Sequence, residues 1–114
     1  MSLRGTREVE KNYQIIRLTG LFDAFSEATF RKVLGTLIDD TPTHMILDLS
    51  KIEFLDSSGL GALVQIAKKV KDAGVTLQIV TNARVTQTVK LVRLEKFLSL
   101  QNSLDEAVQN IKQA

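Results

Sequence analysis

The sequence predicts an α/β domain in which helices pack on a β-sheet. The main reason is that short apolar runs typical of strands alternate with segments of helical periodicity along most of the chain. A second reason is size, because 114 residues without an internal repeat, a linker or a low-complexity stretch make one small domain. A third is composition, since 44% apolar and 25% charged residues are ordinary for a globular protein.

The first part of the chain predicts two strands and a helix. Residues 7–19 favour two short strands, because β-prone side chains recur there, and Gly20 is expected to end the second strand. A helix is expected to follow, capped by Asp23 or Ser26. The loop over residues 39–43 contains the only proline and cannot continue that helix. The apolar surface of the helix would consist of Phe25, Ala28, Phe30, Val33, Leu34, Leu37 and Ile38.

The middle of the chain predicts a buried strand followed by an amphipathic helix. Residues 44–49 are mostly apolar, as in a central strand, and apolar residues then recur at helical spacing over residues 60–73. Gly74 is expected to end this helix in the left-handed conformation. The next strand should cover residues 75–80, where apolar and polar residues alternate at the start.

The last part of the chain predicts a helix, a short strand and a final helix. Thr81-Asn82 offers a cap for the first of these helices. Residues 97–100 are typical of a short strand, and Ser103 with Glu106 forms a capping-box pattern that opens the final helix. The core stripe of the first helix would contain Val85, Val89 and Val92.

Composition excludes several kinds of function. The net charge of +2 is too small to predict nucleic-acid binding. Without cysteine, the chain cannot form disulfides, thiolate zinc sites or a cysteine nucleophile. His44, the only histidine, has no second ligand at metal spacing, so neither a metal site nor a cofactor is expected. No run reaches the roughly 20 apolar residues of a membrane span and no signal peptide opens the chain, so a cytoplasmic protein is expected.

The turn between the central strand and its helix holds the candidate site. Asp56, Ser57 and Ser58 lie where a strand-to-helix turn needs capping oxygens, and Gly59 follows them. A serine hydroxyl at this place lies beside unpaired backbone N–H groups and the positive end of a helix dipole. The turn is therefore either a structural cap or a phosphate site. No histidine or lysine base accompanies the serines in the sequence, so a hydrolase nucleophile is not expected.

The apolar arc of the helix over residues 60–73 is wider than one packing face. Ala62 and Ile66 extend the arc sideways. They either form an exposed stripe that binds a partner or touch another helix. The residues that suffice to cover a sheet are Leu60, Leu63, Val64, Ala67 and Val70.

Two segments resemble a known family. A signature of STAS domains, and in particular of bacterial anti-sigma factor antagonists, resembles the run Ile46-Leu47-Asp48-Leu49 and, after it, Phe54-Leu55-Asp56-Ser57-Ser58-Gly59-Leu60-Gly61. A second segment of that family is similar to Leu18-Thr19-Gly20 followed by Asp23. The resemblance spans nearly all the chain. It implies a single STAS-like domain over residues 1–114, with a mixed sheet of about four to five strands packed with about four helices.

The resemblance also implies a partner-switching protein that is not an enzyme. A serine-kinase anti-sigma factor would bind the antagonist and release its sigma factor, and would then phosphorylate Ser58, with Ser57 as the second choice. Phosphorylation would end the interaction, and a PPM-type serine phosphatase would reverse it. Asp23 would act as a cap, a docking residue or both. The partner-binding surface would include Asp23, Asp56, Ser57, Gly59, Ala62 and Ile66.

Two other classes of function remain open. One is a STAS module that is not phosphorylated and instead binds a small ligand or forms a subunit of a lipid-transport complex. The other is an enzyme, for which the sequence offers only scattered carboxylates. Many relatives carry an acidic residue where this chain has Leu21-Phe22 before Asp23, which leaves the identity of the partner open, and the oligomeric state is open as well. Phe22 and Phe25 would either contact that partner or fill a gap in the core.

Overall fold

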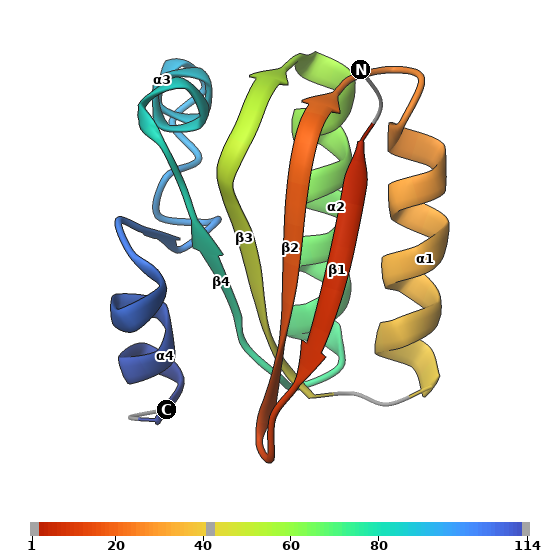
Figure 1. The fold of residues 1–114 in the computed structure, drawn as a ribbon, viewed down its shortest axis with the longest axis vertical. Coiled ribbons are helices and arrows are strands. Elements are labelled where there is room, and N and C mark those ends of the chain that lie inside the picture. The colour runs from red at the N-terminus through yellow and green to blue at the C-terminus, as the bar shows by residue number, and fades with distance from the viewer. Residues whose placement is uncertain (1–2, 41–42, 113–114) are drawn as a thin grey trace.

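The computed structural model describes residues 3–40 and 43–112, without the side chains of residues 36–40. In this part of the chain, five strands form one sheet in the order β1-β2-β3-β4-β5 (Figure 1). The strand β1 is antiparallel to β2, and each further pair of neighbours is parallel, so the sheet is mixed as predicted. The elements in chain order are β1 (Arg4–Val9), β2 (Tyr13–Phe22), α1 (Glu27–Asp40), β3 (His44–Leu55), α2 (Ser57–Asp72), β4 (Leu77–Val80), α3 (Ala83–Leu91), β5 (Leu100–Gln101) and α4 (Leu104–Lys112).

Helical crossovers join the parallel strands. The helix α1 connects β2 to β3, and α2 connects β3 to β4, as parallel pairing requires. Because β2 and β3 are parallel, their carboxyl ends meet at one edge of the sheet, which is the upper edge in Figure 1. The helices α1 and α2 both begin there, so this edge gathers two strand-to-helix turns.

Two apolar clusters fill the space between the sheet and the helices. The larger one joins buried residues of α1, α2 and α3 to side chains of β2, β3 and β4, and the smaller one places Ala107 and Ile111 of α4 against Ile15, Ile46 and Val80. Figure 1 shows α1 and α2 on one side of the strands and α4 on the other. The helix α1 also packs along α2. The helix α2 is therefore covered by the sheet on one side and by α1 on another.

Two strands run further than the sequence predicts. Gly20 does not end β2, which continues to Phe22. The reason is that Gly20 adopts a φ of 101°, at a place where the pairing of β2 with β3 shifts register, so the strand bends without stopping. Likewise β3 continues past residue 49 to Leu55. These extensions carry both strands up to the turn that contains Asp56.

The helix ends confirm several predicted caps. The Asn82 side chain accepts a hydrogen bond from the Val85 N–H at 2.9 Å, and the Ser103 hydroxyl accepts one from the Glu106 N–H at 3.2 Å. Gly74 follows α2 with a φ of 77°. The adjoining amides of Gly74 and Val75 donate to carbonyl groups in the last turn of the helix, as expected for a glycine-terminated helix.

The predicted apolar surface of the first helix is only partly buried. Phe30 and Leu34 lie in the core, whereas Val33 is half-exposed. Phe25 precedes α1 and is 96% exposed, because the helix begins later than its apolar pattern does. Leu37 and Ile38 belong to the residues whose side chains the structure does not describe.

Candidate functional site

The turn from β3 into α2 is built by Asp56. Its backbone is extended, with φ −101° and ψ −174°, and its side-chain Oδ1 accepts a hydrogen bond from the Gly59 N–H at 3.0 Å. The Asp56 carbonyl oxygen accepts the Leu60 N–H at 2.9 Å, and the Asp56 N–H donates to the Phe22 carbonyl oxygen at 3.3 Å. Asp56 therefore caps α2, as one reading of the sequence expected, and ties the start of that helix to the end of β2.

Ser57 and Ser58 occupy the first turn of α2. Ser57 is exposed and Ser58 is partly exposed. Neither hydroxyl makes a hydrogen bond to any other residue in the part of the chain that the structure describes. Both serines lie at the positive end of the helix dipole, beside backbone N–H groups that have no acceptor in the preceding turn. An oxyanion attached to either hydroxyl would meet a favourable electrostatic environment.

The neighbouring turn, from β2 into α1, is closed by Asp23 and Ser26. The Asp23 Oδ1 accepts the N–H groups of Phe25 at 3.0 Å and Ser26 at 3.3 Å, and the Asp23 N–H donates to the Ser26 hydroxyl at 3.0 Å. Asp23 is partly exposed. It therefore has the predicted structural role in its turn, and its docking role stays a prediction.

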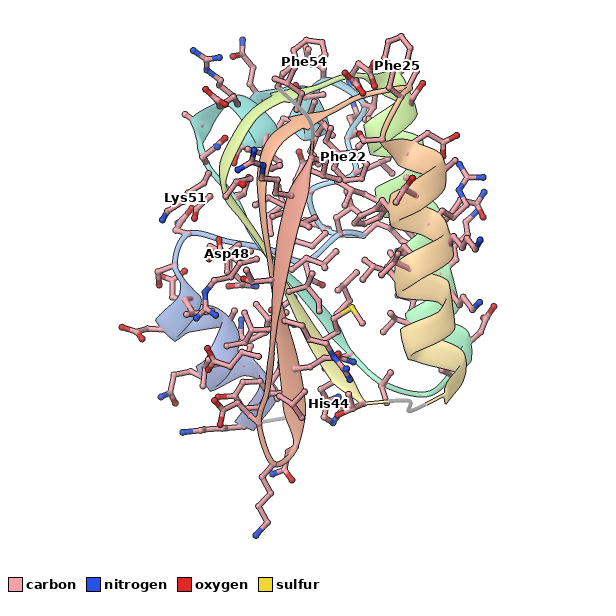
Figure 2. All side chains as sticks on the ribbon, turned by 45° about the vertical axis from the view of Figure 1, so that its right-hand side comes forward. Phe22, Phe25, His44, Asp48, Lys51 and Phe54 are labelled. Atoms are coloured by element: carbon pink, nitrogen blue, oxygen red, sulfur yellow. The ribbon has the colours of Figure 1, made fainter. Side chains whose placement is uncertain are left out.

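Two exposed aromatic residues flank these turns. Phe25 is 96% exposed and Phe54 is 49% exposed. Figure 2 shows both side chains at the end of the molecule where β2 and β3 finish, above the buried Phe22. Aromatic side chains are enriched in the cores of protein–protein interfaces, so two exposed phenylalanines at one end of the molecule mark it as a candidate interface. We refer to Asp23, Phe25, Phe54, Ser57 and Ser58 together as the crossover surface.

Sequence reasoning did not select Phe54 and left Phe25 undecided. Phe22, the other candidate, is fully buried, and its ring centroid lies 4.5 Å from that of Phe30. Phe22 therefore fills the core, whereas Phe25 faces solvent. Phe22 and Phe25 have the same side chain and lie in one short segment, and the position of the turn determines that only Phe22 is covered.

Ala62 and Ile66 do not form an exposed stripe, so their prediction as partner-binding residues is wrong. They are 0% and 1% exposed and belong to the larger apolar cluster. The physical reason is that α1 packs along the side of α2 that the sheet leaves uncovered. Gly59, also predicted to bind the partner, is buried against Phe22 and Leu55, so its side of the helix packs inside the protein and is not part of an exposed surface.

The described residues offer little to other kinds of site. Across residues 3–35 and 43–112, whose side chains the structure describes, no cluster of three or more His, Cys, Asp or Glu side chains is arranged to hold a metal ion. His44 accepts a hydrogen bond on Nδ1 from the Thr76 N–H at 3.1 Å, which ties the start of β3 to the segment before β4. None of the helices in this part of the chain is long and apolar enough to cross a membrane.

Comparison with known proteins agrees with this architecture. Residues 6–107 match the STAS domain family. The anti-sigma-F factor antagonist RsfB of Mycobacterium tuberculosis is 28% identical over 99 residues, which cover 86% of this chain and 80% of that protein. An anti-sigma factor antagonist from Mycobacterium paratuberculosis superposes with a TM-score of 0.88 at 23% identity, over 97% of this chain and 95% of the other.

The same fold occurs in the anti-sigma factor antagonist SpoIIAA of Bacillus. Its unphosphorylated form superposes with a TM-score of 0.82 at 18% identity, over 97% of this chain and 98% of that chain. Its phosphorylated form gives a TM-score of 0.74 at 18% identity, over 95% and 99%. The names of these relatives describe regulators rather than enzymes. The chain belongs to the STAS domain family, as the two sequence segments predicted, and is a relative of the anti-sigma factor antagonists.

Proposed function

We propose that this chain is an anti-sigma factor antagonist that acts by partner switching, and that Ser58 is its phosphorylation site. The observation that carries the proposal is the Ser58 hydroxyl, which is partly exposed and unbonded among the described residues at the start of α2. The names of RsfB and SpoIIAA support the class of partner, and the solved phosphorylated form of SpoIIAA supports the modification. Ser57, which is more exposed, is the second choice.

In the unmodified state, a serine-kinase anti-sigma factor binds the crossover surface. Phe25 and Phe54 supply apolar contact area, since exposed aromatic residues are frequent anchors of interfaces. Asp23 and the neutral serine hydroxyls supply hydrogen-bonding groups at the centre. Binding by the antagonist competes with the sigma factor for the kinase, which frees the sigma factor. The pathway operates in the cytoplasm, where ATP and sigma factors are found.

Phosphorylation ends the interaction through charge. The kinase transfers the γ-phosphoryl group of ATP to Ser58 Oγ, which loses its proton, and ADP leaves. The phosphate adds about −1.5 to −2 charges at neutral pH. The helix start tolerates this charge, because free N–H groups and the dipole favour anions, and the Asp56 cap remains bonded to Gly59. A kinase bound to the phosphorylated turn, in contrast, would have to bury the phosphate. Burying this charge without an opposite charge beside it costs roughly several kcal/mol.

A PPM-type phosphatase resets the switch by hydrolysing the phosphoserine to serine and inorganic phosphate. Its substrate is the same exposed turn, so both enzymes need the crossover surface to be accessible. Because Asp23 and Asp56 are already engaged by backbone N–H groups, the domain does not have to refold between the two states.

The test is to map phosphate by mass spectrometry after incubation of the protein with ATP and an extract of its own host. We expect phosphate on Ser58, none in the Ser58→Ala variant and retained phosphate in the Ser57→Ala control. The kinase is then purified on immobilised protein, and binding is compared between Ser58→Ala and Ser58→Asp. Absence of phosphate on both serines with the phosphatase inhibited contradicts the proposal. Equal binding of Ser58→Asp and the unmodified protein contradicts the charge mechanism.

A further inference from the structure

A groove runs between the edge strand β1 and the helix α1, on the side of the sheet opposite α4. Its volume is about 460 Å³, within the range of small-molecule sites. Every residue of β1 is exposed, and α1 packs along α2, so the described part of the chain leaves the outer part of this face open. The apolar residues that line the groove are Leu3, Ile16, Leu18, Phe30, Val33 and Leu34.

The walls of the groove are apolar and partly solvent-exposed. Ile16 and Leu18 form the sheet wall, and Phe30 and Val33 are spaced along the facing side of α1. Val33 is 52% exposed, which is unusual for a valine on the apolar stripe of a helix. A ligand that covered Val33 would bury apolar surface that the protein alone leaves in water.

The polar lining of the groove is positively charged. Arg4 and Arg7 of β1 line it, and the described lining residues include no Asp or Glu. Neither arginine makes an ion pair in the part of the chain that the structure describes. The Arg7 Nε donates a hydrogen bond to the Gln14 Oε1 at 2.8 Å. Because Gln14 is 1% exposed, this bond holds the guanidinium group against a buried side chain.

We propose that this groove binds a fatty acid. A single acyl chain fits a groove with apolar walls, and a carboxylate complements the fixed guanidinium of Arg7, with Arg4 adding positive charge. A phospholipid fits less well, because it would need room for a second chain. A nucleotide fits poorly, since Phe30, the one aromatic ring among the described lining residues, is 4% exposed and packs on Phe22. The site does not include the serines of the crossover surface.

The probe for this site is dodecanoate, added below its micelle concentration to the full chain and followed by ¹H–¹⁵N NMR. We expect saturable binding of one molecule per chain, with shifts concentrated in β1, the facing part of β2 and α1. Dodecyltrimethylammonium, which has the same chain and the opposite charge, should bind much more weakly. Equal binding of the two amphiphiles, or no binding of dodecanoate, overturns the proposal.

Matched variants locate the site. Val33→Glu places a negative charge in the groove, at an exposed helix position. This charge repels the carboxylate of dodecanoate and should weaken its binding by about tenfold or more. Val9→Glu changes an exposed valine of β1 that does not line the groove, and should bind as the native protein does. Arg7→Gln should reduce the preference for dodecanoate over the cationic amphiphile. Native binding by both Val33→Glu and Arg7→Gln overturns the proposal, as does binding confined to phosphatidylglycerol vesicles.

Discussion

A β-carbon on Gly59 would lie 2.4 Å from the carbonyl oxygen of Phe22, which is closer than real β-carbons approach a non-bonded heavy atom. The same carbonyl oxygen accepts the Asp56 N–H at 3.3 Å. The first turn of α2 thus rests directly on the last residue of β2. The position of Ser58 is fixed by backbone packing, so a partner meets a surface that is already ordered.

Gly59→Ala should destabilise the protein by about 1–3 kcal/mol, because backbone atoms have to move to admit the methyl group. Gly61→Ala is the control two residues further along the same helix. A β-carbon there meets no atom within 4 Å, so the change should stabilise the helix by about 0.5–1 kcal/mol. Chemical denaturation measures both. Equal effects of the two substitutions would show that the close contact with Phe22 does not constrain the turn.

Phe25→Ser should weaken kinase binding by about tenfold or more while leaving the free energy of unfolding within about 0.5 kcal/mol. The reason is that 96% of this side chain faces solvent, so it contributes to contact with a partner and little to the core. Phe54→Ser should act in the same direction, with a larger loss of stability because Phe54 is half-buried.

The control for both phenylalanines is Val9→Ser. Val9 is 65% exposed and pairs with Gln14, at the end of the sheet away from the crossover surface. Calorimetric titration with the purified kinase should give unchanged affinity for this variant. If Phe25→Ser and Phe54→Ser both bind the kinase with native affinity, the two aromatic residues do not belong to the interface. That result would leave the assignment of Ser58 as the phosphorylation site untouched, because phosphate mapping tests it separately.

Asn82→Ala should cost more stability than the removal of an ordinary cap. The Asn82 side chain caps α3 and also donates to the carbonyl oxygens of Ile52 at 2.9 Å and Ser50 at 3.1 Å. We expect a loss of about 2–4 kcal/mol in total. Ser103→Ala removes a cap from α4 without any such link to a strand, and should cost about 1 kcal/mol. Thermal unfolding distinguishes the two, and similar losses would show that the bonds to β3 contribute nothing.

The carboxyl group of Glu8 should titrate below its usual range. The Arg17 guanidinium donates a hydrogen bond to Glu8 at 2.8 Å and lowers the pKa of Glu8. The Glu8 carboxylate in turn raises the pKa of Glu10, because it accepts a hydrogen bond from the protonated form of Glu10. Because the folded-state pKa of Glu8 is depressed, its contribution to stability is present above the unfolded-state pKa and is lost as the pH falls through the folded-state value.

Carbon-13 NMR titration checks both carboxyl groups. Arg17→Met should raise the pKa of Glu8 toward its ordinary value, and Glu8→Gln should lower the pKa of Glu10 toward its ordinary value. A Glu8 titration that is unchanged in Arg17→Met would contradict the assigned cause. The two arms separate the effect of the cation from the effect of the neighbouring carboxyl group.

The sequence predicted features that depend on local chemistry. The caps at Asp56, Asn82 and Ser103 follow from a side-chain oxygen placed near unpaired N–H groups, and Gly74 follows from its freedom to adopt a positive φ. The alternation of strands and helices was predictable for the same reason, since periodicity is a property of short windows. Family resemblance added that the sheet is mixed and has about four to five strands.

Features that depend on how elements pack were beyond the sequence. Ala62 and Ile66 are buried because α1 lies along α2, and no periodicity specifies which neighbour a helix has. A glycine often ends a strand, but at Gly20 a shift in the register of β2 with β3 lets β2 continue. The groove beside Val33 arises because α1 packs against α2 and leaves β1 uncovered, so the groove also results from how the elements pack.

The two margins of the sheet have consequences for how the protein behaves at high concentration. The margin formed by β1 has unpaired backbone groups that another strand can join, and such margins seed aggregation. Arg4, Arg7 and Glu8 place charges along it, which disfavours the approach of a second copy. The opposite margin, β5, is only 2 residues long and gives an incoming strand little to bind. The sheet therefore resists growth in both directions, and the chain is suited to remain dispersed.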